Sequence, residues 1–139
     1  ALGQDMPNGV YGQMRAPFFA MEGKAISDFT ERYRARFNDW PADWAIMAYE
    51  SMLVYAEGIR KANSVEAQPL TQAMENAEFD LLRGKTRFRA IDHQGDVPSF
   101  IGRTVTDSRY PFKILADVAR VPAQKIWPSE DEVKASRKA

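Results

Sequence analysis

The sequence contains no cysteine and only one histidine among its 139 residues. Without cysteine, disulfide bonds, thiolate metal sites and a cysteine nucleophile are excluded. A zinc site would need three or four nitrogen, sulfur or oxygen ligands at workable spacing, and His93 stands alone in a predicted turn. We therefore expect His93 to be a solvated turn residue, and we expect no metal and no other cofactor.

Motifs of catalytic and nucleotide-binding sites are also absent. No serine lies in a nucleophile-elbow context, and the one histidine would have to serve as base for any of them. Neither G-x-x-x-x-G-K-[ST] nor G-x-G-x-x-G occurs, so nucleotide phosphates have no visible cradle. No set of residues combines a nucleophile, a base and an oxyanion donor. The sequence therefore does not predict an enzyme.

The chain lacks an excess of either charge and lacks a long apolar run. Its 19 Lys and Arg residues balance 19 Asp and Glu residues, which argues against nucleic acid as the main partner, because phosphate neutralisation needs surplus positive charge. No apolar run approaches the roughly 18 residues that a membrane helix needs. The length suits one domain that can bury a core.

Hydrophobic periodicity predicts three helices in the first half of the chain. The most strongly marked helix runs from Pro41 to Asn63 and is apolar on nearly every side, so it must be covered from more than one direction. Its main apolar stripe consists of Ala45, Ala48, Tyr49, Met52, Tyr55, Ala56 and Ile59. We expect water around its charged residues, Glu50, Glu57, Arg60 and Lys61. A second amphipathic helix is expected from Ala25 to Phe37, and a third after Asn63, with Pro69 near its beginning.

Alternating patterns predict strands at residues 10–16, 86–90, 99–105 and 112–121. The DHQGD sequence between the second and third of these is typical of a turn, so we expect those two strands to form a hairpin. Near the end, Ser129 and Glu132 have capping-box spacing, which predicts a short final helix. Helices together with strands place the chain in the α/β class.

One position suggests a ligand contact. Trp44 lies in the first turn of the predicted helix from Pro41 to Asn63, where unpaired backbone N–H groups and the positive end of the helix dipole favour an anionic group. An aromatic side chain beside that helix end would form a wall of a carboxylate pocket. The other aromatic residues of this region are expected mostly in the core.

The chain resembles the C-terminal half of type I periplasmic solute-binding proteins, the leucine/isoleucine/valine-binding receptors of ABC importers. The likeness runs from Val10 to about Val121, through the segments GVYG, APFF, DFTERYRARFN, PADWAIMAYESMLVYAEGIRKAN and FDLLRGKTRFRAIDHQGD. Its marks are the P-x-x-x-A-x-x-x-Y start of the long helix, the Arg60-Lys61-Ala62 ending, and a G-K-x-x-F strand followed by a D-x-x-G-D turn.

The resemblance implies an α/β fold of partial lobes, with helices packed on a sheet. Residues 1–16 would be a strand segment of the second lobe, residues 17–105 the helical and hairpin segment of the first lobe, and residues 106–139 the returning strand and C-terminal helix of the second lobe, with hinges around Pro17 and Val105. Trp44 matches the position where the family places an aromatic near the ligand, with Ala45 and Tyr49 as its nearest companions.

The resemblance also implies partners and a location. A small amino acid or carboxylate would be bound once the missing half is present, and a membrane permease would collect it in the periplasm or another extracytoplasmic space. In the family, the long helix packs on a sheet built mostly from the half that this chain lacks. We therefore expect the exposed stripe to drive self-association into a homo-oligomer. The alternative is a structural or oligomerisation domain that binds no ligand.

Overall fold

The computed structural model describes residues 3–75 and 77–137, and these fall into two compact units. The first unit comprises Ala1–Ile46 and Pro98–Val121, and the second comprises Met47–Val97 and Pro122–Ala139. These boundaries lie elsewhere than the lobe limits expected after residues 16 and 105. The assignment of segments to the lobes of a receptor stays a prediction.

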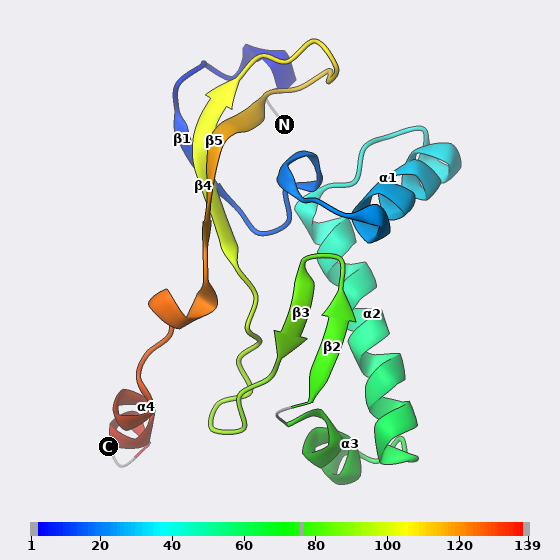
Figure 1. Ribbon diagram of the computed structural model, residues 1–139, viewed down its shortest axis with the longest axis vertical. Helices are drawn as coiled ribbons and strands as arrows, with labels where there is room; N and C mark the ends of the chain where they lie inside the picture. The colour runs from blue at the N-terminus through cyan, green and yellow to red at the C-terminus, as the bar shows by residue number, and fades with distance from the viewer. Residues whose placement is uncertain (1–2, 76, 138–139) are drawn as a thin grey trace. The chain divides into compact units, whose positions relative to one another are not determined.

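The first unit is built on a three-stranded antiparallel sheet (Figure 1). Its strands are β1 (Tyr11–Met14), β4 (Ser99–Val105) and β5 (Ile114–Val121), in the order β1-β4-β5. In β4, Phe100, Gly102 and Thr104 are buried and alternate with residues that are more accessible, as expected when one sheet face covers a core. The short η1 turn (Gly3–Asp5) precedes this sheet in the chain, and η2 (Phe18–Ala20) follows β1.

Helix α1 (Lys24–Phe37) belongs to the same unit. Ile26 and Phe29, three residues apart, are buried, while the charged residues occupy the rest of its surface. The helix ends at Asn38, which takes a left-handed conformation with φ of 52° and donates its backbone N–H to the Arg34 carbonyl.

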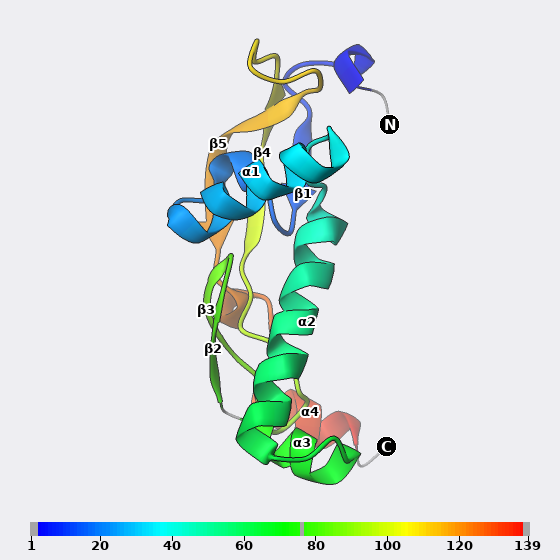
Figure 2. The same cartoon turned by 90° about the vertical axis from the view of Figure 1, so that its right-hand side faces the viewer.

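The second unit combines most of helix α2 (Asp43–Ala62) with helix α3 (Ala67–Met74) and the hairpin of β2 (Glu78–Leu81) and β3 (Gly84–Arg87) (Figure 2). Gly58 is buried where α2 meets α3. The two helices are close at this point, because a Cβ added to Gly58 would lie 2.9 Å from Leu70 Cδ1. Val54 and Phe79 are also buried. None of the helices in the described part of the chain is long and apolar enough to cross a membrane.

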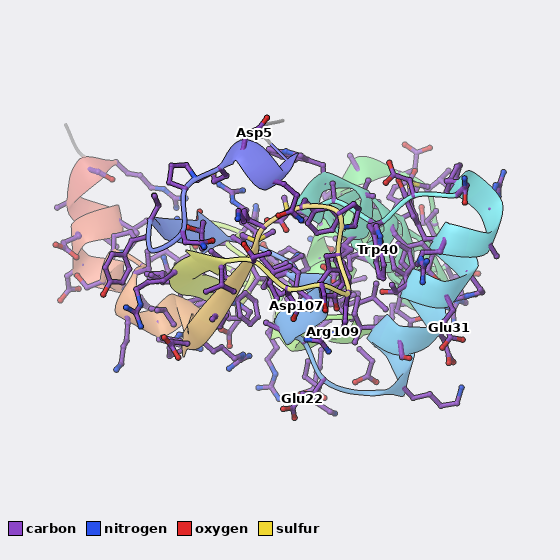
Figure 3. All side chains as sticks on the ribbon, turned by 90° about the horizontal axis from the view of Figure 1, so that it is seen from above. Asp5, Glu22, Glu31, Trp40, Asp107 and Arg109 are labelled. Carbon is purple, nitrogen blue, oxygen red and sulfur yellow. The ribbon has the colours of Figure 1, made fainter. Side chains whose placement is uncertain are left out.

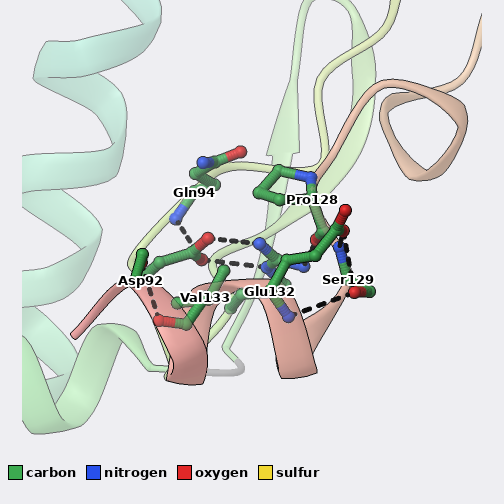
Figure 4. Close-up of polar contacts among 8 residues, drawn as sticks. Asp92, Gln94, Pro128, Ser129, Glu132 and Val133 are labelled. Atoms are coloured by element: carbon green, nitrogen blue, oxygen red, sulfur yellow. Dashed lines mark hydrogen bonds and ion pairs between the residues drawn. The ribbon is translucent and has the colours of Figure 1, made fainter. Parts of the chain in front are cut away.

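Arg89 connects the C-terminal segment to the rest of the second unit. Figure 4 shows two residues that it contacts, Asp92 and Pro128. The Arg89 guanidinium forms an ion pair with Asp92, donates to the Pro128 carbonyl at 3.0 Å and lies 4.6 Å from the centre of the Trp127 ring. The segment contains η3 (Ala123–Lys125) and helix α4 (Glu130–Ser136). The hydrogen bond from Arg89 lowers the pKa of the Asp92 carboxyl.

The predicted helices are confirmed, because α1 and α2 lie within one or two residues of their expected limits and Ser129 and Glu132 form the expected capping box. The expected hairpin across the DHQGD turn is wrong. Strand β4 pairs with β1 and β5, and β3 pairs with β2, which the sequence did not indicate. His93 is half exposed as expected, yet its Nε2 lies 2.8 Å from Glu75 Oε1.

Helix α2 buries a different face from the one expected. The buried positions are Ile46, Glu50, Val54 and Gly58, four residues apart, which form one row along the helix. The expected apolar stripe, from Ala45 to Ile59, is half-buried or exposed at every position, and Met52 is 64% exposed. Glu50, expected in water, is one of the most deeply buried residues of the described chain.

Candidate ligand-binding site

The sequence-predicted site lies at the start of α2. Trp44 and Ala45 are the second and third residues of this helix, in the first unit, whereas Tyr49 belongs to the second unit. The Trp44 side chain is 73% exposed, and Ala45 and Tyr49 are half-buried. The first unit therefore leaves the Trp44 ring accessible. That these three residues contact a ligand stays a prediction.

The first residue of α2, Asp43, holds this end of the helix against the chain that leaves β1. Its Oδ2 accepts a hydrogen bond from the Arg15 backbone N–H at 2.7 Å. Its Oδ1 is buried without a hydrogen-bond partner among the described residues, an arrangement that typically costs about 1–3 kcal/mol. A carboxylate in the first turn also complements the positive end of the helix dipole. Asp43 therefore adds a negative charge at the helix end where we expected an anionic ligand group.

A cluster of aromatic side chains in the first unit was not predicted as a site. The Trp40 ring, just before α2, stacks on Phe18 at a centroid distance of 5.3 Å and meets Tyr110 at 4.8 Å. Phe19 contacts Phe18 edge-on, and Phe112 lies beside Tyr110. Such pairs contribute beyond the area they bury. Three separate stretches of sequence supply these rings, so no local spacing marks the cluster.

Beside this cluster lies an open pocket of about 390 Å³. We call it the aromatic pocket, and define it by Phe18, Phe19, Glu31, Arg34, Trp40 and Tyr110. Its volume is within the roughly 300–1,000 Å³ typical of small-molecule sites. The Arg34 guanidinium lies 4.0 Å from the centre of the Trp40 ring, a cation–π contact that fixes the position of the charge.

The loop between β4 and β5 supplies Tyr110 to the aromatic pocket. Asp107 and Arg109 of the same loop are labelled in Figure 3. Asp107 shapes this loop: its carboxylate accepts hydrogen bonds from the Arg109 side chain and backbone, and its carbonyl accepts the Tyr110 N–H at 3.1 Å. The hydrogen bonds from the Arg109 side chain, together with that from its backbone, lower the pKa of the Asp107 carboxyl to about 2. The loop is therefore held by an ion pair at neutral pH.

A second pocket lies within the second unit, where α2 faces the β2–β3 hairpin. Its volume is about 410 Å³, and its walls are mainly apolar. Glu50 and Arg83 line it, and the Glu50 carboxylate accepts hydrogen bonds from the Arg83 backbone N–H at 2.9 Å and from Arg83 Nε at 2.6 Å. Since both Glu50 oxygens are engaged, this ion pair offers a ligand no free carboxylate oxygen.

The arrangement of acidic and histidine side chains gives no basis for metal binding. Within residues 3–75 and 77–137, no three His, Asp or Glu residues come close enough together to hold an ion. The exposed Trp44 ring and the open aromatic pocket are accessible to a small molecule.

Comparison with known proteins identifies the family. Residues 1–109 match the model of the periplasmic binding protein family. Among solved structures, an ABC-type branched-chain amino acid transporter protein from Rhodopseudomonas palustris is 22% identical, with a TM-score of 0.75 over 84% of this chain and 32% of that chain. An amino acid ABC transporter substrate-binding protein from Pseudomonas fluorescens is 15% identical, with a TM-score of 0.77 over 95% of this chain and 35% of that chain.

A third structure is an ABC transporter solute-binding protein from Rhodopseudomonas palustris, bound to 3,4-dihydroxybenzoic acid. It is 16% identical, with a TM-score of 0.70 over 87% of this chain and 34% of that chain. The chain thus spans about a third of the length of these structures. The α/β fold expected from the resemblance is confirmed, as part of a larger architecture. From the family match over residues 1–109, the chain belongs to the periplasmic binding protein family.

Proposed function

We propose that this chain forms part of an extracytoplasmic receptor that binds a small amino acid or carboxylate and delivers it to the membrane permease of an ABC importer, without catalysis. The observation that carries the proposal is the family match over residues 1–109. The ligand class is supported by the relatives, which are named as amino acid transporters or contain a benzoic acid derivative.

Within this receptor, Trp44 is proposed to form an aromatic wall of the ligand site, with Ala45 and Tyr49 beside it. The support is its exposure of 73% at the start of α2, because a tryptophan ring that the first unit leaves uncovered can pack on a ligand. Asp43 in the same turn favours a ligand that brings a positive group to this end of the helix. An α-amino acid, with its ammonium group, meets that condition.

Calorimetric titration with branched-chain, aromatic and aliphatic carboxylic acids tests the proposal. We expect a binding heat for at least one ligand class, and we expect Trp44→Ala to abolish it. Tyr11→Ala is the matched control, because Tyr11 is also a highly exposed aromatic of the first unit, on β1. Equal heats for the wild type and Trp44→Ala would refute the role of Trp44.

The second candidate function is a structural or oligomerisation domain. It is favoured by the apolar stripe of α2, where Met52 and Tyr55 are exposed in the second unit, next to the exposed Leu53. Soluble proteins rarely leave such side chains together in water unless they bind a partner. If no acid in the panel produces heat while the chain forms oligomers, this candidate replaces the first.

A further inference from the structure

The sheet of the first unit has two edge strands, β1 and β5, and only β5 is protected against pairing with another strand. On β5, Asp117 takes a left-handed conformation with φ of 52°, the register with β4 shifts, and Asp117 and Arg120 are exposed charges. Bulges and charges of this kind keep a further strand from adding to an edge. On β1, the register with β4 is unbroken from Tyr11 to Met14, and none of these residues is charged or a proline.

The open side of β1 presents the backbone groups of Tyr11 and Gln13. Alternate residues of an antiparallel strand bond to the neighbouring strand, and the Val10 carbonyl accepts the Thr104 N–H of β4 at 2.9 Å. Gly12 therefore also bonds to β4, whereas Tyr11 and Gln13 direct their N–H and C=O groups away from it.

Nothing in the described part of the chain uses these groups. Within residues 3–75 and 77–137, the N–H and C=O groups that Tyr11 and Gln13 direct away from β4 form no hydrogen bond. The next N–H in the series, that of Arg15, is occupied, because it donates to Asp43 at 2.7 Å. The Tyr11 side chain is 76% exposed, and Gln13 is exposed too. The open stretch of the edge is therefore short and accessible.

This stretch is complementary to a second copy of itself. In an antiparallel pair, two residues directly opposite each other exchange both of their N–H···O bonds. When two β1 strands lie antiparallel with Gly12 on the two-fold axis, Tyr11 of each copy lies opposite Gln13 of the other, and all the open backbone groups of both residues gain partners. A two-fold axis also brings each residue near its own copy, so a charge there would be repelled. Tyr11, Gly12 and Gln13 carry none.

We infer that β1 is a dimerisation edge, at which two copies of the chain join their three-stranded sheets into one continuous sheet. The edge belongs to the first unit, whereas the exposed part of the α2 stripe at Met52 and Tyr55 belongs to the second. The inference therefore depends neither on association through α2 nor on the proposed receptor function.

Disulfide cross-linking tests the register, because the chain has no cysteine of its own. Tyr11→Cys and Gln13→Cys are prepared in a Met52→Lys background, which weakens association through α2, and are oxidised separately and as an equimolar mixture. Directly opposite residues have Cα atoms about 5.5 Å apart, which a disulfide can span, whereas two copies of residue 11, or of residue 13, lie diagonally at about 7–8 Å. We expect about tenfold more cross-linked dimer from the mixture than from either variant alone, with the linked peptides identified by mass spectrometry.

Hydrogen exchange followed by NMR gives an independent readout. As the protein concentration rises from micromolar to millimolar, we expect the Tyr11 and Gln13 amides to exchange about tenfold or more slowly, because they become bonded in the dimer. The Gly12 amide, which already bonds to β4, should change less.

Gln13→Pro removes one donor from the open edge without removing a bond to β4. We expect it to shift the chain to the monomer in sedimentation experiments and to abolish the concentration dependence at Tyr11. Ile101→Lys is the control, because Ile101 is 41% exposed on the face of the central strand β4 and has no backbone group at the edge. It should still dimerise, and circular dichroism confirms that each variant is folded.

The inference is overturned if the mixture gives no cross-linked dimer, or no more than the single variants give. It is also overturned if exchange at Tyr11 and Gln13 does not depend on concentration, which would leave the edge to a strand of another protein. Dimerisation lost in Ile101→Lys but kept in Gln13→Pro would assign association to the sheet face instead. Ligand titrations of Trp44→Ala do not bear on these results, so the receptor proposal and this inference fail separately.

Discussion

At the scale of single residues, the Glu50 and Arg83 ion pair is the strongest polar constraint in the second unit. The side chains of Glu50 and Arg83 are 2% and 8% exposed. The Glu50 carboxylate accepts hydrogen bonds from the backbone N–H and the Nε–H of Arg83 and forms an ion pair with its Nη2. Burying two charges is costly, and close hydrogen bonding offsets that cost only while both partners are present. The main effect of the pair is therefore to fix the position of the β2–β3 turn against α2. Its net contribution to stability is small.

Arg83→Met tests this pair. Because the variant leaves the Glu50 carboxylate buried without its partner, we expect the free energy of unfolding to fall by about 3–5 kcal/mol. The double variant Glu50→Leu/Arg83→Met should recover much of that loss, since it removes both charges. Urea denaturation followed by circular dichroism measures both. A loss below about 1 kcal/mol for the single variant would show that the pair is not a buried constraint.

The Asp107 carboxyl is expected to control the acid sensitivity of the β4–β5 loop. Its pKa is lowered to about 2, so its contribution to stability is complete above its unfolded value near 3.9 and is lost as the pH falls toward 2. We therefore expect the Tyr110 amide signal in NMR spectra to stay constant from pH 7 to pH 4 and to move below pH 4. Asp107→Asn should remove this step. An unchanged step in that variant would assign it to another group.

At the scale of elements, the irregular pairing of β4 and β5 depends on a glycine. The register shifts between Ile101 and Arg103, at Gly102, so one strand bulges against the other. A Cβ at Gly102 would lie 2.7 Å from the Ala116 carbonyl oxygen. The backbone there cannot yield as a flexible side chain can.

Gly102→Ala is therefore expected to destabilise the first unit by about 1–3 kcal/mol, the usual cost of overpacking. Arg120→Ala, an exposed substitution on β5, is the matched control and should change the free energy of unfolding by less than about 0.5 kcal/mol. Thermal unfolding compares the two. If Gly102→Ala and the wild type have equal stability, β4 and β5 can move apart at the bulge without loss, and the close contact at Gly102 is not required.

The helices could be predicted from sequence because their signals are local. The 3.6-residue periodicity of α1 and α2, and the Ser129 and Glu132 spacing, act within a few residues of each other. The pairing of β4 was predicted wrongly because its partner β1 lies more than 80 residues away in the sequence. No local sequence pattern indicates which distant strand a given strand pairs with. The four-residue strand β2 lacks the β-branched residues that mark strands.

Of the candidate sites, too, only the one with a local sequence signal could be predicted. Trp44 could be placed at the start of α2, and its exposure is compatible with a ligand contact, because helix position and aromatic character are both local. The aromatic pocket was missed because Phe18, Arg34 and Tyr110 approach one another only through the tertiary fold. The enrichment of aromatics between residues 18 and 55 was the only sequence signal.

At the scale of the whole molecule, one face of α2 is buried and the opposite face is accessible to solvent. One row of side chains is buried by the chain itself, and the opposite apolar stripe is left accessible. The chain covers about a third of the length of its solved relatives. An apolar stripe that this chain does not cover is expected for a helix that packs on both sides in a larger protein. The uncovered stripe is expected to find a partner, and a second copy of the chain is the one always present.

Met52→Lys tests this expectation. We expect multi-angle light scattering to give the wild type a mass above that of the monomer, rising with concentration, and Met52→Lys to shift it toward the monomer, because a charge in the stripe must be desolvated on association. Val65→Lys, at a similarly exposed position outside the stripe, is the control and should behave like the wild type. A monodisperse wild-type monomer with cooperative unfolding would contradict self-association.

The central claim, that this chain supplies a ligand wall at the start of α2, is tested most directly by fluorine NMR of the protein labelled with 5-fluorotryptophan. Three signals are expected, from Trp40, Trp44 and Trp127, each assigned by substitution. The account predicts that at least one amino acid or small carboxylate shifts the Trp44 signal while the Trp127 signal, held beside Arg89, stays in place. A folded protein whose Trp44 signal does not move with any member of the ligand panel would contradict it.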